Sequence, residues 1–148
     1  MPDHTCGEST KEYAVTLDRK NGGLAELTDQ LGNSGVNIIT LSMADGNGAR
    51  TVRLITSDEK TCRDMLEKLK LRYTENEIVT VVVEDKPGSL AKLLKKLHRS
   101  NVEVNSTYML NKRNGKVEIV LGLSDIEEGK NLLFRKLGLS STIQAVKD

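Results

Sequence analysis

The chain has 148 residues, of which 37% are hydrophobic and 29% charged, a composition typical of a globular protein. Its 22 basic and 21 acidic residues leave a formal charge of +1, whereas nucleic-acid-binding proteins usually carry a basic excess or stripe. No apolar run approaches the roughly 20 residues that span a bilayer, and the polar start "MPDHTCGEST" lacks the profile of a secretory signal. We therefore expect a cytoplasmic protein that binds neither nucleic acid nor membrane, with a disordered leader at residues 1–10.

The elements of residues 11–76 follow from periodicity and turn signals. Alternation from Tyr13 to Leu17 predicts a strand, and leucines at helical spacing then predict a helix that the glycines of "GNSG" (32–35) end. The segments "VNIITLSM" (36–43) and "RTVRLIT" (50–56) flank "DGNG" (45–48), which predicts a hairpin. Ser57 and Asp58 can cap a second helix, and "LRYTE" (71–75) is expected to form a short last strand.

The same pattern returns 66 positions later. Placing Gly22 on Gly88 aligns the leucines of the two first helices, and an insertion near Asn114 brings "TSD" (56–58) onto "LSD" (123–125). The second copy therefore predicts strands at 78–84, 102–110 and 116–123, a helix from Gly88, another from Asp125, and a short last strand at "STIQAV" (141–146). Strand–helix–strand–strand–helix–strand, taken twice, predicts an α+β protein with two ferredoxin-like units, residues 11–76 and 77–148, each an antiparallel sheet with helices on one face. Because a unit of this size is marginally stable alone, we expect the two sheets to be joined side by side.

The second strand of each copy indicates how the sheet faces differ. Glu103, Asn105 and Thr107 alternate with Val102, Val104 and Tyr108, which predicts one polar face in the second copy. The first copy instead has Ile39, Leu41 and Met43 on that predicted face. We interpret this as a face covered by another subunit of a homodimer, with a modest exposed apolar patch as the alternative.

Each copy has a glycine-bearing corner where its first strand meets its first helix. The corners are Gly22–Gly23, and Gly88 followed by Ser89. A helix N-terminus offers unpaired N–H groups and a partial positive charge, and glycine lets a carboxylate approach the backbone closely. A glycine at such a turn can also serve only the turn.

The stretches "DRKNGGLAELTDQLGNSGVNI" and "EDKPGSLAKLLKKLHRSNVEV" both resemble the opening of an ACT domain. That motif has a strand ending in an acidic or polar residue, then Pro-Gly, a leucine two places on, a helix, and Gly-[Val/Ile]-Asn. The resemblance covers nearly the whole chain after residue 10. It implies two ACT domains in tandem that form a non-catalytic regulatory protein, with an amino acid held at an interface between ACT units.

By position, the resemblance implies twelve ligand-binding residues and no metal or cofactor. They are Asp18, Arg19, Lys20, Asn21, Gly22, Gly23 and Asn37 in the first copy, and Asp85, Lys86, Gly88, Ser89 and Asn105 in the second. Asn21 replaces the usual proline and Glu103 stands at the motif's asparagine, so we expect unequal sites. Regulation further implies a partner enzyme or regulator, because no catalytic or DNA-binding domain is attached.

The two first helices differ in charge. Lys92, Lys95, Lys96 and Arg99 of the second copy correspond to Glu26, Asp29, Gln30 and Asn33 of the first. These faces are either simply solvated or meet one another and set the pairing of units.

Other function classes have weaker support. The sequence shows no Ser-His-Asp or Cys-His pairing and no P-loop, which argues against an enzyme. His4 and Cys6 are too few ligands for a metal site, and Cys62 falls on an apolar helix stripe, where a buried thiol is expected. Tyr108 is the one aromatic candidate for stacking on RNA. An interaction scaffold that binds no ligand is the main alternative.

Overall fold

The computed structural model describes residues 10–18, 22–46 and 48–143 of the chain. Contacts between Cα atoms divide these into two compact units, which we call the N-terminal unit (residues 11–76) and the C-terminal unit (described residues from 77 onward, together with Thr10 at the start of the first strand). Arg19, Lys20 and Asn21, which the sequence proposed as ligand-binding residues, lie outside the described residues, as do His4 and Cys6.

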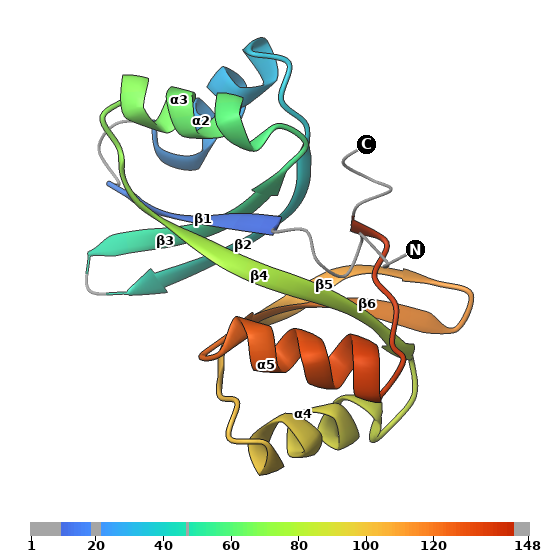
Figure 1. Ribbon diagram of the computed structural model, residues 1–148. Coiled ribbons are helices and arrows are strands. Elements are labelled where there is room, and N and C mark those ends of the chain that lie inside the picture. The colour runs from blue at the N-terminus through green and yellow to red at the C-terminus, as the bar shows by residue number, and fades with distance from the viewer. Residues whose placement is uncertain (1–9, 19–21, 47, 144–148) are drawn as a thin grey trace. The chain divides into compact units, whose positions relative to one another are not determined.

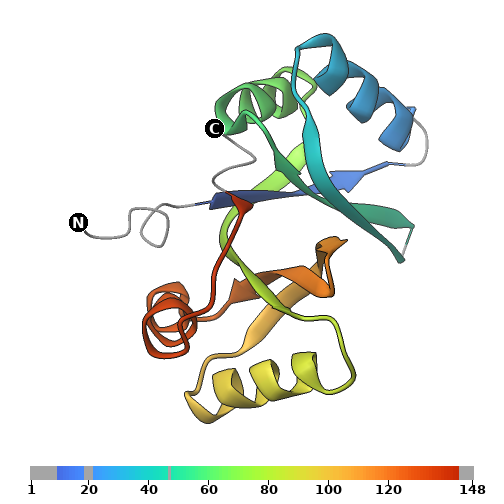
Figure 2. The ribbon, with the colours of Figure 1, turned by 90° about the vertical axis from the view of Figure 1, so that its right-hand side faces the viewer.

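The N-terminal unit contains β1 (Thr10–Leu17), α2 (Gly23–Asn33), β2 (Ile38–Gly46), β3 (Ala49–Thr56), α3 (Glu59–Lys68) and the start of β4 (Arg72–Glu84). Its strands lie in the order β2-β3-β1-β4, with β3 antiparallel to both β1 and β2. Leu27 and Leu31 of α2 and Cys62 and Leu66 of α3 are buried in one core with Tyr13, Val15, Val52 and Leu54 of the sheet. Both helices therefore cover the same sheet face (Figures 1 and 2).

The C-terminal unit contains the rest of β4, then α4 (Ser89–Arg99), β5 (Val104–Arg113), β6 (Lys116–Leu123), α5 (Ile126–Lys130) and the π-helical turn η1 (Asn131–Lys136). Strand order is β4-β6-β5, with β6 antiparallel to both neighbours. Leu93 and Leu97 of α4 pack with Leu132 and Leu133 of η1 against Val81, Ile119 and Leu121. The helices again cover one face of the strands (Figure 2).

Positions that correspond in the two copies have matching local structure. Asp58 and Asp125 are both N-caps, and each side chain accepts a hydrogen bond from the N–H three residues on. Lys70 and Gly138, just after the second helix of each copy, both have a left-handed backbone, with φ of 57° and 65°. The sequence similarity therefore extends to caps and turns.

Two predicted strand boundaries are wrong. Residues 71–75 and 78–84 were expected in separate strands, but β4 runs without a break from Arg72 to Glu84, because no glycine or proline interrupts it. The strand expected at 141–146 is not formed by residues 141–143, and residues 144–146 lie outside the described part of the chain. Ser140 accepts one bond from the Val82 N–H, but the Thr142 N–H then donates to the buried Glu118 carboxylate at 2.8 Å instead of to a strand.

The expected face of the second strand in the N-terminal unit is also wrong. A β-bulge between Ile38 and Thr40 inserts one residue, so that the alternation changes phase after Ile39. Leu41 then lies opposite Leu54 and packs against the core beneath the helices. Met43, 45% exposed, lies opposite the core residue Val52. The apolar stripe that suggested a covered outer face is therefore interrupted, and it no longer supports the expected homodimer.

A bulge at the corresponding place in β5 has the same effect. The register shifts between Val104 and Ser106, on either side of Asn105. Thr107 lies opposite the core residue Leu121, whereas Tyr108 lies opposite Val120 and therefore points to the other face. The predicted grouping of Tyr108 with Val104 on one face is wrong.

Among the described residues, no helix is both long and apolar enough to cross a bilayer.

Candidate functional site

The corner of the N-terminal unit is built on two left-handed glycines. Gly22 is the N-cap of α2 with φ of 73°, and Gly23 follows with φ of 53°. A Cβ at Gly22 would lie 2.9 Å from Glu26 Cβ, so glycine is required there by contact as well as by conformation. No described side chain caps this helix. The first N–H groups of a helix have no partner within the helix itself, so a bound anion can accept from them.

A hollow of about 660 Å³ lies beside this corner. Four segments of the N-terminal unit line it: the end of β1, the first turn of α2, the start of β3 and the chain after α3. The ionisable residues among its described lining are Asp18, Glu26, Lys70 and Arg72, whose opposite charges balance. Leu17, Leu27 and Leu71 provide apolar walls.

The corner of the C-terminal unit has one left-handed glycine. Gly88, with φ of 89°, is the N-cap of α4, again without a capping side chain among the described residues. Its carbonyl accepts the Lys92 N–H at 2.9 Å, and the Ser89 N–H donates to the Lys86 carbonyl at 3.2 Å. A Cβ at Gly88 would meet nothing within 4 Å, so conformation alone favours glycine there.

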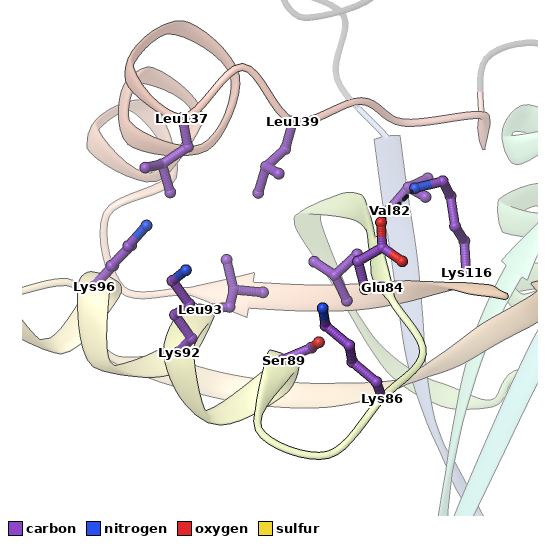
Figure 3. A pocket seen from close by; sticks show the side chains of 11 residues that line it. Val82, Glu84, Lys86, Ser89, Lys92, Leu93, Lys96, Lys116, Leu137 and Leu139 are labelled. Carbon is purple, nitrogen blue, oxygen red and sulfur yellow. Dashed lines mark hydrogen bonds and ion pairs between the residues drawn. The ribbon is translucent and has the colours of Figure 1, made fainter.

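A second hollow, of about 340 Å³, lies beside this corner and is lined by the equivalent segments of the C-terminal unit. Figure 3 shows Lys92 and Lys96 extending from α4 toward the space below Leu137 and Leu139. Lys86, Lys116 and Glu84 complete the charged lining. Lys116 Nζ donates to Glu84 Oε1 at 3.0 Å. This bond and the charge of Lys116 hold the pKa of the exposed Glu84 carboxyl below its usual value, with a smaller contribution from Lys86.

The two hollows correspond position by position. The pairs that line them are Thr16 and Val82, Leu17 and Val83, Asp18 and Glu84, Gly23 and Ser89, Glu26 and Lys92, Leu27 and Leu93, Ala49 and Lys116, Leu69 and Leu137, and Leu71 and Leu139. Each pair occupies the same place relative to its corner glycine. The chain therefore contains the same recess twice, with different charge.

Several residues that the sequence proposed are part of these corners. Asp18 and Gly23 line the N-terminal hollow, Lys86 and Ser89 line the C-terminal hollow, and Gly22 and Gly88 start the helices.

Three other proposed residues lie elsewhere. The Asn37 backbone exchanges hydrogen bonds with Ser57, and Asn105 is exposed at its bulge. Asp85 forms an ion pair with Lys112 at 3.6 Å. None of the three is among the described residues that line either hollow.

The walls that face each corner were not predicted from the sequence. Glu26 and Lys92 lie four residues after the corner glycines, a spacing that places them on the same side of the helix. This four-residue spacing was present in the sequence. No sequence pattern could have identified Leu71 and Leu139, because only tertiary packing brings the segment after the second helix of each unit beside the first helix.

No three His, Cys, Asp or Glu residues form a possible metal site in the described ranges.

Comparison with known proteins finds similarity in structure only. No protein-family model matches the sequence, and no curated protein matches it. Among solved structures, protein BT0572 from Bacteroides thetaiotaomicron superposes with a TM-score of 0.81 at 22% identity, covering 89% of this chain and 90% of that one.

Two regulatory subunits of aspartate kinase also share the architecture. The subunit from Thermus thermophilus, in its ligand-free form, has a TM-score of 0.59 at 9% identity, over 86% of this chain and 92% of its own. The subunit from Thermus flavus has a TM-score of 0.60 at 10% identity, over 83% and 88%. The chain therefore shares its fold with these regulatory subunits. The ferredoxin-like α+β architecture expected from the order of strands and helices is confirmed, except that the last strand of the second unit is not formed by the described residues.

Proposed function

We propose that the chain consists of two ACT domains in tandem, residues 11–76 and 77–148, and acts as a non-catalytic regulatory protein that binds an amino acid. The observation that carries this proposal is the duplicated hollow, which lies beside an uncapped helix start in each unit. Uncapped N–H groups and left-handed glycines suit the carboxylate of a zwitterion. The fold shared with regulatory subunits of aspartate kinase supports a regulatory role over an enzymatic one.

Affinity requires that the hollows be closed when a ligand is bound. A sensor working between millimolar and micromolar concentrations needs about 4 to 8 kcal/mol of binding free energy. A helix dipole contributes about 0.3 to 1 kcal/mol, and each hydrogen bond about 0.5 to 1.5 kcal/mol. We therefore propose that a neighbouring ACT unit covers the ligand, and that a second copy of the chain or a partner enzyme or regulator reads the change in packing.

A thermal-shift screen of the common amino acids tests this function. A ligand at about 100 times its dissociation constant stabilises the folded chain by about 2.7 kcal/mol. Ser89→Gln extends a side chain into the C-terminal hollow, and Ala49→Gln does so in the N-terminal one. Ala91→Gln and Ala44→Gln, at exposed positions of α4 and β2, are the matched controls.

We expect at least one amino acid to raise the melting temperature, and one blocking variant to remove this effect while its control retains it. If no amino acid stabilises the chain, or if blocking and control variants behave alike, the binding function is wrong. The ligand-free interaction scaffold then becomes the better description.

A further inference from the structure

The hollow of the C-terminal unit concentrates positive charge. Four lysines line it, Lys86, Lys92, Lys96 and Lys116, against the single carboxylate of Glu84. Lys92 and Lys96 are one helical turn apart on α4, and their side chains extend to the same side (Figure 3). The lining therefore carries a formal excess of three positive charges.

Most of this charge is not neutralised within the described part of the chain. Lys116 pairs with Glu84 at 3.0 Å. Lys86, Lys92 and Lys96 form no ion pair with any described residue. Like charges held around a recess repel one another and focus a positive potential into it, which favours an anion from solution. An amino acid with a neutral side chain carries one carboxylate, which would neutralise only part of this excess of positive charge.

The opposite wall of the hollow is apolar. Leu93 is 4% exposed at its base, and Leu137 and Leu139 lie across from the lysines (Figure 3). Contact with these side chains suits a carbon skeleton and removes water from one side of the recess, which strengthens the charged contacts on the other. A volume of about 340 Å³ is sufficient for a small metabolite.

The N-terminal hollow provides an internal comparison. Glu26 stands where the other unit has Lys92, and Ala49 stands where it has Lys116. Gln30 corresponds to Lys96 and is uncharged. Because both helices begin at a left-handed glycine while the charge of the described lining differs, the difference concerns the kind of molecule each hollow accepts.

We propose that the lysine-lined hollow of the C-terminal unit binds a small organic dianion, a short carbon skeleton with two acidic groups, and that the N-terminal hollow does not. This inference rests on the proposed function, since it specifies the ligand class of one of the two corners. Lys92 and Lys96 bind one acidic group, and Lys86 with the first turn of α4 binds the other. Leu93, Leu137 and Leu139 contact the skeleton between them.

Isothermal titration of the full chain at low ionic strength tests the proposal with glutarate, L-glutamate and phosphoserine as probes. Inorganic phosphate separates recognition of a lone anion from recognition of the skeleton, and L-glutamine and L-lysine are the zwitterionic comparisons. We expect a dianion to bind at least about tenfold more tightly than L-glutamine, and about 0.5 M NaCl to weaken its binding strongly.

Charge-removing variants locate the site. Lys92→Gln and Lys96→Gln should each weaken dianion binding about tenfold or more, because each removes a charged hydrogen-bond donor to the ligand. Lys95→Gln is the matched control, because it lies on the same helix, is exposed and does not line the hollow. Equal losses in all three variants would show a diffuse charge effect and overturn the proposal.

The remaining outcomes separate this inference from the proposed function. If neutral amino acids bind and dianions do not, the dianion site is wrong while amino-acid binding stands. If glutarate binds as tightly as L-glutamate and phosphoserine while L-glutamine and L-lysine do not bind, the dianion site stands and the preference for an amino acid is wrong. Binding of inorganic phosphate as tight as that of every organic dianion would overturn recognition of a carbon skeleton, and no binding of any probe would overturn both proposals.

Discussion

Ser57 and Asn37 exchange two hydrogen bonds of 2.9 Å: the Asn37 N–H donates to Ser57 Oγ, and the Ser57 N–H donates to the Asn37 carbonyl. Ser124 and Glu103 form the same pair of bonds, also at 2.9 Å, in the C-terminal unit. In each unit one serine thus joins the end of the third strand to the residue before the second strand. Residues 37 and 103 contribute only their backbone N–H and carbonyl groups to this contact. The side chain is therefore not constrained by it, and a glutamate can stand at position 103 where the first copy has Asn37.

Removing either serine hydroxyl should destabilise the protein. Ser57→Ala and Ser124→Ala each leave a backbone N–H without its acceptor, so we expect each to lower the free energy of unfolding by about 1 kcal/mol. The double variant should lose about 2 kcal/mol, because the two sites share no partner. Urea unfolding measures these changes. Ser89→Ala, whose hydroxyl makes no hydrogen bond with the described residues, is the control and should change stability by less than about 0.5 kcal/mol.

The elements were predictable where periodicity is long and regular. Leucines at helical spacing located α2 and α4, and alternation with a turn signal located the hairpin of β5 and β6. The bulges at Ile39 and Asn105 were not predictable, because a single inserted residue changes no propensity and leaves both possible phases of alternation chemically reasonable. Packing beneath the helices decides between them.

The bulge in β2 can be tested by comparing two apolar side chains. Leu41 packs against the core and Ile39 is not among the residues that do so. We expect Leu41→Ala to lower the free energy of unfolding by about 2 kcal/mol, because the truncation leaves a cavity against Leu54. Ile39→Ala should cost less than about 1 kcal/mol. Chemical denaturation of both variants decides the matter, and a larger loss for Ile39→Ala would contradict the observed register.

The site was predictable in part. A glycine between a strand and a helix identified both corners from a local signal. The walls of the hollows come from segments distant in the chain, such as Leu137 and Leu139, so a motif confined to one loop cannot contain them. The motif asparagine likewise led to Asn37, whose place in the fold is decided by its contact with Ser57.

The N-cap of α3 should make stability depend on pH. Thr61 donates to the Asp58 carboxylate through its hydroxyl at 2.6 Å and its N–H at 3.0 Å, and these bonds lower the pKa of Asp58 from the ordinary 3.8. Because the folded-state pKa is the lower one, this contribution is complete above pH 3.8 and is lost as the pH falls through the folded-state pKa. Asp58→Asn keeps an acceptor but lacks the charge.

We therefore expect the wild-type chain to be more stable than Asp58→Asn by about 0.3 to 1 kcal/mol near pH 7, with the difference shrinking below pH 3.8. Thermal unfolding across the acid range measures it. A difference that stays constant down to the lowest pH at which both chains fold would exclude this origin.

Cys62 should be unreactive in the folded protein. Its side chain is fully buried in the core of the N-terminal unit, and burial raises the pKa of its thiol to about 11 from 9.0. At neutral pH this alone lowers the reactive thiolate fraction about 100-fold. In a Cys6→Ser background, labelling with a thiol reagent should therefore be slow in buffer and rapid in denaturant. Equally rapid labelling in both conditions would contradict burial of this residue.

The corner glycine of the C-terminal unit separates backbone conformation from packing. Gly88 has φ of 89° and open space where the methyl group of an alanine would lie, so Gly88→Ala introduces strain without a clash. We expect it to lower the free energy of unfolding by about 1 to 2 kcal/mol, the cost of a left-handed residue with a Cβ. Gly46→Ala is the matched control, because that position also has open space but no positive φ. It should be neutral or slightly stabilising. Urea unfolding of both variants measures the difference. Equal stabilities would mean that the turn before α4 adapts freely. The corner would then not be a fixed binding site for a carboxylate.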